Sequence, residues 1–291
     1  MPPHYLVVAS ETADQREERR QDVGATSSET FATTLASLVP GCRVDEMSCV
    51  DGNAPPSIVH LRRYDAVFLS GSPISMNKET PETLEAAAFM RRVFESGVPS
   101  FGSCAGLQIA AVAAGGATKP REPRTEAAFA RGIVATDAGR DHPLLQGRPL
   151  AWDAPAMHSD EVAELPASAL ILARTTTTPI QAAEIRHAGG TFWGVQYHPE
   201  LTLAEIAAAL RRQSDELVEE KLAADDSAVF DHAGRIDALD ADPERKDLAW
   251  QLGLDRQVID ADFRMREIRN FIDSASSLRA PNALATLAET A

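Results

Sequence analysis

Residues 98–116 read VPSFGSCAGLQIAAVAAGG, and this stretch decides the fold. The residues Pro99–Ser103 predict a buried strand, and Ala105–Ala114 predict an apolar helix that Gly115-Gly116 ends. Cys104 falls at the junction, so the chain turns there directly from a strand into a helix. A strand that is followed at once by a helix is the repeating unit of a parallel sheet covered by helices.

The same alternation extends in both directions along the chain. Helices are expected from Ser27 or Ser28 to Leu38 and over Glu82–Glu95. Further short strands are expected at Tyr5–Ser10, Arg43–Val50, Ala66–Ser70, Gly132–Thr136, Leu170–Thr175, Ile180–Ile185 and Phe192–Tyr197. This order predicts an α/β fold, a flavodoxin-like, doubly wound and mostly parallel sheet with helices on both faces.

The charge distribution divides the chain into two parts. Residues 211–291 are richer in charged side chains than residues 1–210. We therefore expect one core-forming domain over residues 1–210 and an acidic, helical C-terminal extension over residues 211–291. Two apolar stripes at helical spacing support helices there, namely Leu203, Ile206, Leu210 and Leu217, and then Met265, Ile268, Phe271 and Ile272. The extension either packs on the core or forms a surface for a dimer or another partner.

Composition excludes several classes of protein. The chain has 291 residues, 44% of them hydrophobic, and a formal net charge of −15. This balance argues against a disordered chain, a nucleic-acid-binding protein and a basic membrane binder. No apolar run is long enough for a membrane span, and the N-terminus lacks the pattern of a signal peptide. Three cysteines without a C-x-x-C pair predict neither disulfides nor a zinc site, so we expect a cytoplasmic protein.

Cys104 is the candidate nucleophile. It lies between Gly102 and Gly106 at a turn from strand to helix, which is the arrangement of a nucleophile elbow. The glycines allow a tight turn and close packing of helix on strand. The N-terminus of the following helix faces the sulfur and favours its thiolate form. Cys42 and Cys49 lack such a frame and are expected to be structural.

A second motif, Tyr197-His198-Pro199-Glu200, supplies a candidate base. Pro199 favours an extended conformation at His198. Residues two apart in an extended segment project to the same side, so Glu200 can orient the imidazole of His198. His158, which a predicted loop carries, is the other histidine that we consider for the site, and a substrate contact is the role expected of it.

Together, Gly102–Gly106 (GSCAG) and Tyr197–Glu200 (YHPE) resemble the motifs of the class I, triad-type glutamine amidotransferase domain. The resemblance extends over roughly residues 1–210. It implies catalytic roles for Cys104, His198 and Glu200 and requires no metal or organic cofactor. It further implies an oxyanion hole at Gly71, Ser72 and Ala105 and substrate contacts from Gln108, His158, Ser159 and Asp160. Serine stands at position 72 where the family usually has glycine, which places a side chain beside the substrate.

Three functions remain open on this basis. The first is a glutaminase that hydrolyses the γ-amide of L-glutamine through a cysteinyl thioester, giving glutamate and ammonia for a separate synthase or ligase subunit. The second is a free-standing hydrolase of γ-glutamyl amides or peptides. The third is a catalytically idle regulatory binding module. The sequence favours the first, because residues 211–291 are too few for a synthetase domain and no nucleotide-binding motif is present. A homodimer is also possible, whereas nucleic acid and membrane partners are not expected.

Overall fold

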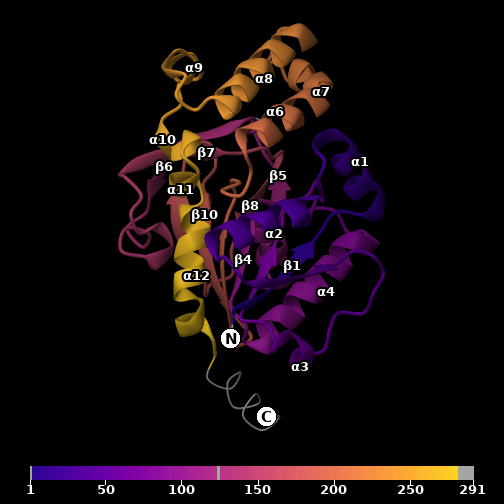
Figure 1. The fold of residues 1–291 in the computed structure, drawn as a ribbon. Coiled ribbons are helices and arrows are strands. Elements are labelled where there is room, and N and C mark those ends of the chain that lie inside the picture. Colours follow the sequence, from indigo (N-terminus) through magenta and orange to yellow (C-terminus); the bar gives the residue numbers. More distant parts are fainter. Residues whose placement is uncertain (1, 123–124, 281–291) are drawn as a thin grey trace.

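The computed structural model describes residues 2–122 and 125–280. A nine-stranded sheet forms the centre of these residues (Figure 1). Its strands lie in the order β2 (Arg43–Ser48), β1 (His4–Ala9), β3 (Ala66–Leu69), β4 (Ser100–Ser103), β11 (Gly190–Val195), β10 (Ala182–His187), β9 (Leu170–Arg174), β6 (Phe129–Ala135) and β7 (Ala151–Pro155). Neighbours from β2 to β11 pair in parallel, and neighbours from β11 to β7 pair antiparallel.

Strand β1 explains why helices cover both faces of the sheet. Leu6 and Val8 point into one apolar cluster, and Tyr5 and Val7 point into another. Because side chains alternate along a strand, the apolar run of residues 5–9 in β1 must be covered on both faces. The first cluster includes α4 (Pro81–Ser96) and α5 (Ala105–Ala113), and the second includes α2 (Ser27–Leu38) and α12 (Arg266–Leu278). The expected doubly wound α/β fold is confirmed.

Several elements were not predicted, and their sequences explain why. Helix α1 (Ala13–Val23) buries only Arg19, so it has no apolar stripe. Strands β7 and β8 (Asp160–Glu164) carry charged residues, and β8 pairs only with β5 (Ala117–Pro120) in a separate two-stranded sheet. Helix α2 begins where expected, but its N-cap is Thr26 in a capping box with Glu29.

The C-terminal residues form helices, as predicted, and the last one completes the core. They are α6 (Leu203–Arg212), α7 (Ser214–Glu219), α8 (Asp226–Ala241), α9 (Lys246–Leu252), α10 (Arg256–Ile259), α11 (Ala261–Arg264) and α12. Phe271 of α12 lies 5.4 Å from the ring of Phe68 and 5.5 Å from that of Phe101. Helices α6 to α9 build a separate apolar cluster at one end of the molecule (Figure 1). The division into residues 1–210 and 211–291 stays a prediction.

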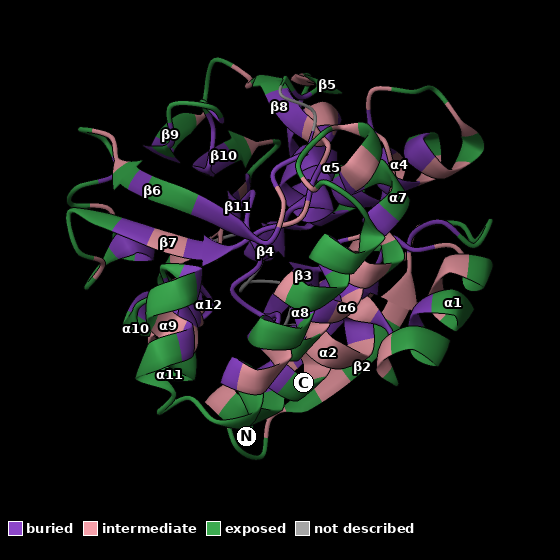
Figure 2. Ribbon diagram, turned by 90° about the horizontal axis from the view of Figure 1, so that it is seen from above, coloured by how far each residue is buried: buried purple, intermediate pink, exposed green. Residues whose placement is uncertain are grey.

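Burial is highest where β4 and α5 meet. Viewed from above, both elements are buried, whereas α1 and α8 present exposed residues to the outside (Figure 2). The connection between β4 and α5 therefore lies in the interior of the described structure. Within the two described ranges, no helix combines the length and the apolar character needed to cross a membrane.

Candidate active site

Cys104 occupies a strained turn between β4 and α5. Its φ is 51° and its ψ is −107°, a backbone conformation that residues with a side chain rarely adopt. Gly106 allows this turn, because a Cβ there would lie 2.8 Å from the carbonyl oxygen of Leu69 in β3. The helix can thus lie directly against the sheet, and the strain directs the cysteine away from both elements. This geometry agrees with the predicted nucleophile elbow.

His198 reaches the same place from the segment that follows β11. Its Nδ1 lies 2.8 Å from Oε1 of Glu200, and Ser103 Oγ donates a hydrogen bond of 2.7 Å to the same oxygen. The backbone N–H of His198 donates to the carbonyl oxygen of Pro155 at 2.7 Å. Because Nδ1 faces Glu200, the other ring nitrogen is left for Cys104. The three residues Cys104, His198 and Glu200 lie together and are all buried.

The electrostatics favour a charged imidazole. Burial opposes the charged form of His198, but the Glu200 carboxylate and the Cys104 sulfur outweigh burial and raise the pKa of His198 to about 10. An imidazolium beside the sulfur stabilises a thiolate. By contrast, burial raises the pKa of the Cys49 thiol to about 12, so Cys49 lacks the thiolate needed for nucleophilic attack.

The pKa of His198 makes a prediction about pH dependence. In the wild type, kcat/KM should fall on the alkaline side near pH 10, where the imidazolium loses its proton. Glu200→Gln removes the carboxylate that favours the charged form, so this alkaline limb should move to lower pH. Full pH profiles of kcat/KM measure the shift. Glu95→Gln, an exposed carboxylate in α4, is the matched control and should leave the limb in place.

Gly71 leaves room for the imidazole. A Cβ at this position would lie 2.5 Å from Cε1 of His198, which is too close for any real contact. Gly71→Ala should therefore displace the ring from Cys104 and lower kcat about 10- to 100-fold, as small misplacements of catalytic groups do. Steady-state kinetics test this result. An unchanged circular dichroism spectrum would show that the fold survives, and an unchanged kcat would contradict the expected displacement.

The predicted oxyanion donors lie beside Cys104, at the N-terminus of α5 and just after β3. Ala105 is the first residue of α5, so its N–H is one of the amides that a helix leaves without an internal partner. Gly71 and Ser72 follow the carboxyl end of β3. The side chain of Ser72 is engaged, since its hydroxyl accepts hydrogen bonds from Ser10 Oγ at 2.8 Å and from the Ile74 N–H at 3.3 Å. Serine at this position thus ties the ends of β1 and β3 together.

Three of the predicted substrate-contacting residues, His158, Ser159 and Asp160, lie in and beside the loop before β8, and Gln108 of α5 contacts this loop. Gln108 Nε2 donates to the carbonyl oxygen of Asp160 at 2.9 Å. His158 is buried, with Nε2 2.8 Å from Glu126 and Nδ1 2.9 Å from the Asp160 carbonyl. Both imidazole nitrogens therefore have partners inside the protein. The carbonyl oxygen of Ser159 accepts from the Arg121 N–H at 2.9 Å.

Glu126 supports this loop, and the sequence motifs did not identify it. Besides His158, it accepts a 2.8 Å hydrogen bond from Gln181. Burial opposes its ionisation, but His158, Gln181 and Arg121 together lower the pKa of the Glu126 carboxyl. It lies between β5 and β6, where the sequence motifs place no site residue. Its sequence carries no signal that could have identified it.

Two pockets meet at Cys104. The first, of about 450 Å³, is lined by residues 158–160, by Gln108 and Lys78, and by Gln213 and Glu216. The second, of about 160 Å³, is lined by His198 and Glu200 and continues past them. We call them the loop pocket and the histidine pocket. They share five lining residues, Ser72, Pro73, Cys104, Met157 and Gln213.

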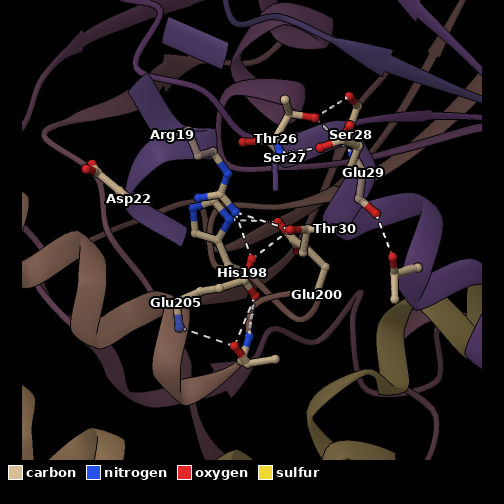
Figure 3. Close-up of polar contacts among 12 residues, drawn as sticks. Arg19, Asp22, Thr26, Ser27, Ser28, Glu29, Thr30, His198, Glu200 and Glu205 are labelled. Atoms are coloured by element: carbon tan, nitrogen blue, oxygen red, sulfur yellow. Dashed lines mark hydrogen bonds and ion pairs between the residues drawn. The ribbon is translucent and has the colours of Figure 1, made fainter. Parts of the chain in front are cut away.

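The wall of the histidine pocket comes from elements that the sequence did not connect with the site. Arg19 of α1 forms an ion pair of 2.8 Å with Glu205 of α6, and Thr30 Oγ1 donates to the same carboxylate at 2.7 Å (Figure 3). Glu11 and Ser27 also line it. Among the described residues, no group of three or more His, Cys, Asp and Glu side chains could hold a metal ion.

A family model for "Glutamine amidotransferase class-I" matches residues 30–214. The chain belongs to this family. A curated relative from a Pseudomonas species, named γ-glutamyl-L-1-hydroxyisopropylamide hydrolase, is 36% identical over 218 residues, which are 74% of this chain and 73% of the relative. As a member of this family, the chain is a cysteine-dependent amide hydrolase.

Other relatives match a smaller share of their own length. The GMP synthase of Leifsonia xyli is 34% identical over 152 residues, which are 52% of this chain and 29% of the synthase. Among solved structures, a glutamine amidotransferase from Thermotoga maritima aligns with a TM-score of 0.61 at 14% identity and covers 93% of this chain and 99% of its own. One from Methylobacillus flagellatus has a TM-score of 0.61 at 16% identity, with coverages of 94% and 96%. These structures support the fold.

Proposed function

We propose that this protein is a free-standing hydrolase of γ-glutamyl amides whose amine is larger than ammonia. The observation that carries the proposal is the histidine pocket, a cavity of about 160 Å³ that both Cys104 and His198 line. A cavity of this size accommodates a molecule as large as benzene. His198 lines this pocket and not the loop pocket. Because the acid must protonate the leaving nitrogen, the amine part of the substrate belongs on this side.

The loop pocket suits the glutamyl part. It combines the cation Lys78 with the carboxylates of Asp160 and Glu216. Asp160 Oδ2 accepts a 2.5 Å hydrogen bond from Ser75, which holds this carboxylate in one position. A free amino acid carries an ammonium and a carboxylate on one carbon, and a pocket with both signs of charge can bind both groups. We assign the α-carboxylate to Lys78 and the α-ammonium to Asp160 and Glu216.

The reaction follows from these placements. The Cys104 thiolate attacks the amide carbon, and the N–H groups of Ala105 and of Ser72 or its neighbour stabilise the oxyanion. The His198 imidazolium, held by Glu200, donates its proton to the nitrogen, so the C–N bond breaks and the amine leaves. Neutral His198 then takes a proton from water, which attacks the thioester. The C–S bond breaks, and glutamate and the Cys104 thiolate are released.

Two observations support this proposal over a glutaminase that feeds a separate synthase. The curated relative that matches three quarters of this chain is named for a substituted γ-glutamyl amide, whereas the GMP synthases match about half of it. In addition, Gln213, which precedes α7, lines both pockets, and Glu216 in α7 lines the loop pocket. The chain's own C-terminal helices thus lie at the mouth, where an ammonia-consuming partner would have to dock.

The decisive experiment measures kcat/KM of the purified chain for L-glutamine and for γ-glutamyl ethylamide. We expect the ethylamide to be hydrolysed at least as well as glutamine without any added protein. Hydrolysis of glutamine alone, at a low rate that rises when a co-purifying protein is added, would overturn the proposal in favour of the partner-fed glutaminase. No hydrolysis of either compound would support the idle binding module.

Lys78 offers a separate test of the loop pocket. Lys78→Ala removes the cation that we assign to the α-carboxylate, and KM for γ-glutamyl ethylamide should rise about tenfold with little change in kcat, because this contact is equal in ground and transition states. Initial rates over a range of substrate concentrations give both constants. Lys246→Ala, on the distant helix α9, is the matched control. A change in kcat alone would contradict the assignment.

A further inference from the structure

The histidine pocket contains one buried carboxylate that the reaction does not use. Glu11 follows the carboxyl end of β1 and is 3% exposed. It lines the same pocket as Cys104 and His198. Its two carboxylate oxygens accept hydrogen bonds from Ser27, one from the hydroxyl at 2.7 Å and one from the backbone N–H at 3.1 Å. Ser27 is the first residue of α2, and a helix N-terminus stabilises an anion.

The cations of the pocket already have partners. Arg19 pairs with Glu205 at 2.8 Å and also donates to Thr30 Oγ1 at 3.3 Å (Figure 3). Arg212, at the mouth, lies 3.4 Å from Asp22. Among the described residues, no cation forms an ion pair with Glu11. With the charges of Arg19 and Arg212 paired, Glu11 gives the pocket a hydrogen-bond acceptor with negative charge.

We propose that Glu11 selects the amine part of the substrate and accepts a hydrogen bond from a donor group on it, an inference that rests on the proposed function. The preferred substrates are γ-glutamyl amides of small amines with a hydroxyl group or a second ammonium group near the nitrogen. Each lone pair of Glu11 that is not used by Ser27 can accept such a donor. An amine that carries a carboxylate is disfavoured, because it would face Glu11 and also Glu18 at the mouth.

The volume of the pocket limits the size of the amine. About 160 Å³ accommodates roughly six heavy atoms. Ethanolamine and similar amino alcohols fit, whereas a long peptide chain does not. The turn after β3, where Gly71 lies against the His198 ring, lines the same pocket as Glu11, so an amine that is held by Glu11 has its nitrogen in the pocket that contains the acid. Glu11 thus binds the amine part of the substrate, and His198 protonates the nitrogen of that same part.

The test compares three probes of similar size, namely γ-glutamyl ethanolamide, γ-glutamyl ethylamide and γ-glutamylglycine. We expect kcat/KM for the ethanolamide to exceed that for the ethylamide about tenfold, as a hydrogen bond to a buried charge would give, and that for γ-glutamylglycine to be lowest. Glu11→Gln keeps the size of the side chain and an oxygen for Ser27. In this variant the ratio of ethanolamide to ethylamide should fall several-fold, and γ-glutamylglycine should gain relative to both.

Glu17→Gln provides the matched control, since it removes one negative charge from the exposed face of α1 and lines neither pocket. Its ratios should equal those of the wild type. Equal rates for all three probes in the wild type would overturn the role of Glu11 and leave the proposed function intact. Hydrolysis of glutamine with no activity on any of the three probes would instead overturn the proposed function itself. Unchanged ratios in Glu11→Gln would also exclude Glu11 as the selecting residue.

Discussion

Cys104→Ser is expected to lower kcat for γ-glutamyl amides by about 10⁴-fold or more, because loss of a catalytic nucleophile removes most of the rate enhancement. A serine hydroxyl is a much weaker nucleophile than a thiolate near neutral pH. The neighbouring groups stay in place, since the Glu200 carboxylate is held by Ser103 as well as by His198. Substrate affinity should therefore change little. Isothermal titration with γ-glutamyl ethylamide and product assays over long incubation measure the two quantities.

The thioester offers a more direct observation than the lost rate. Wild-type protein that is mixed with substrate and quenched in acid should carry one γ-glutamyl group on the peptide that contains Cys104, as mass spectrometry would detect. The Cys104→Ser protein should carry none. Cys49→Ala is the matched control. Cys49 is buried like Cys104, but its thiol donates a hydrogen bond of 3.4 Å to the carbonyl oxygen of Ala9. Wild-type turnover in Cys104→Ser would exclude a cysteinyl intermediate.

The motifs that carry the reaction could be recognised in the sequence because each is local. Cys104 lies within five residues that combine the glycines and the strand-to-helix turn, and His198 and Glu200 are two residues apart. Their mutual contact was predicted from this spacing, and the 2.8 Å distance agrees with it. The alternation of strands and helices could be predicted for a similar reason, since a buried strand such as β1 contains an unbroken apolar run, residues 5–9.

The pocket walls could not be predicted, because their residues are far apart in the chain. Arg19 and Glu205 are separated by 186 positions, and α1 lacks the apolar stripe that would have predicted a helix there. Glu11 had a signal that could have been used. It directly follows a predicted strand, and the carboxyl ends of parallel strands are where sites of such folds assemble. Lys78 also comes after the carboxyl end of a parallel strand, β3, although it lies further along the loop.

The packing of the C-terminal helix leads to a second large effect, on stability. Glu267 of α12 is fully buried and forms an ion pair of 2.6 Å with Arg148, whose side chain is 2% exposed. Its other oxygen accepts hydrogen bonds from Arg148 Nε at 2.7 Å and from the hydroxyl of Tyr197 at 2.8 Å. Tyr197 precedes His198, so α12 is tied to the segment that carries the imidazole.

Glu267→Leu should lower the free energy of unfolding by about 3–5 kcal/mol, because it leaves the guanidinium of Arg148 buried without its anion. Urea denaturation followed by tryptophan fluorescence measures the change, since Trp152 and Trp193 are buried and report on the core. Arg148→Met combined with Glu267→Leu should recover a large part of the loss, as an apolar pair of similar volume replaces a buried ion pair without leaving a charge behind.

An exposed ion pair gives the contrast that makes this result specific. Arg245 and Asp247 lie 2.6 Å apart, but their side chains are 46% and 54% exposed. Asp247→Asn should leave the urea midpoint unchanged, because solvent screens such pairs. If Glu267→Leu behaves like Asp247→Asn, the buried network does not hold α12 on the sheet. Alternatively, Glu267→Leu lowers the free energy of unfolding, and adding Arg148→Met does not recover the loss. In that case, the contacts of Glu267 with Tyr197 and its other partners stabilise the fold, and its pairing with the charge of Arg148 does not.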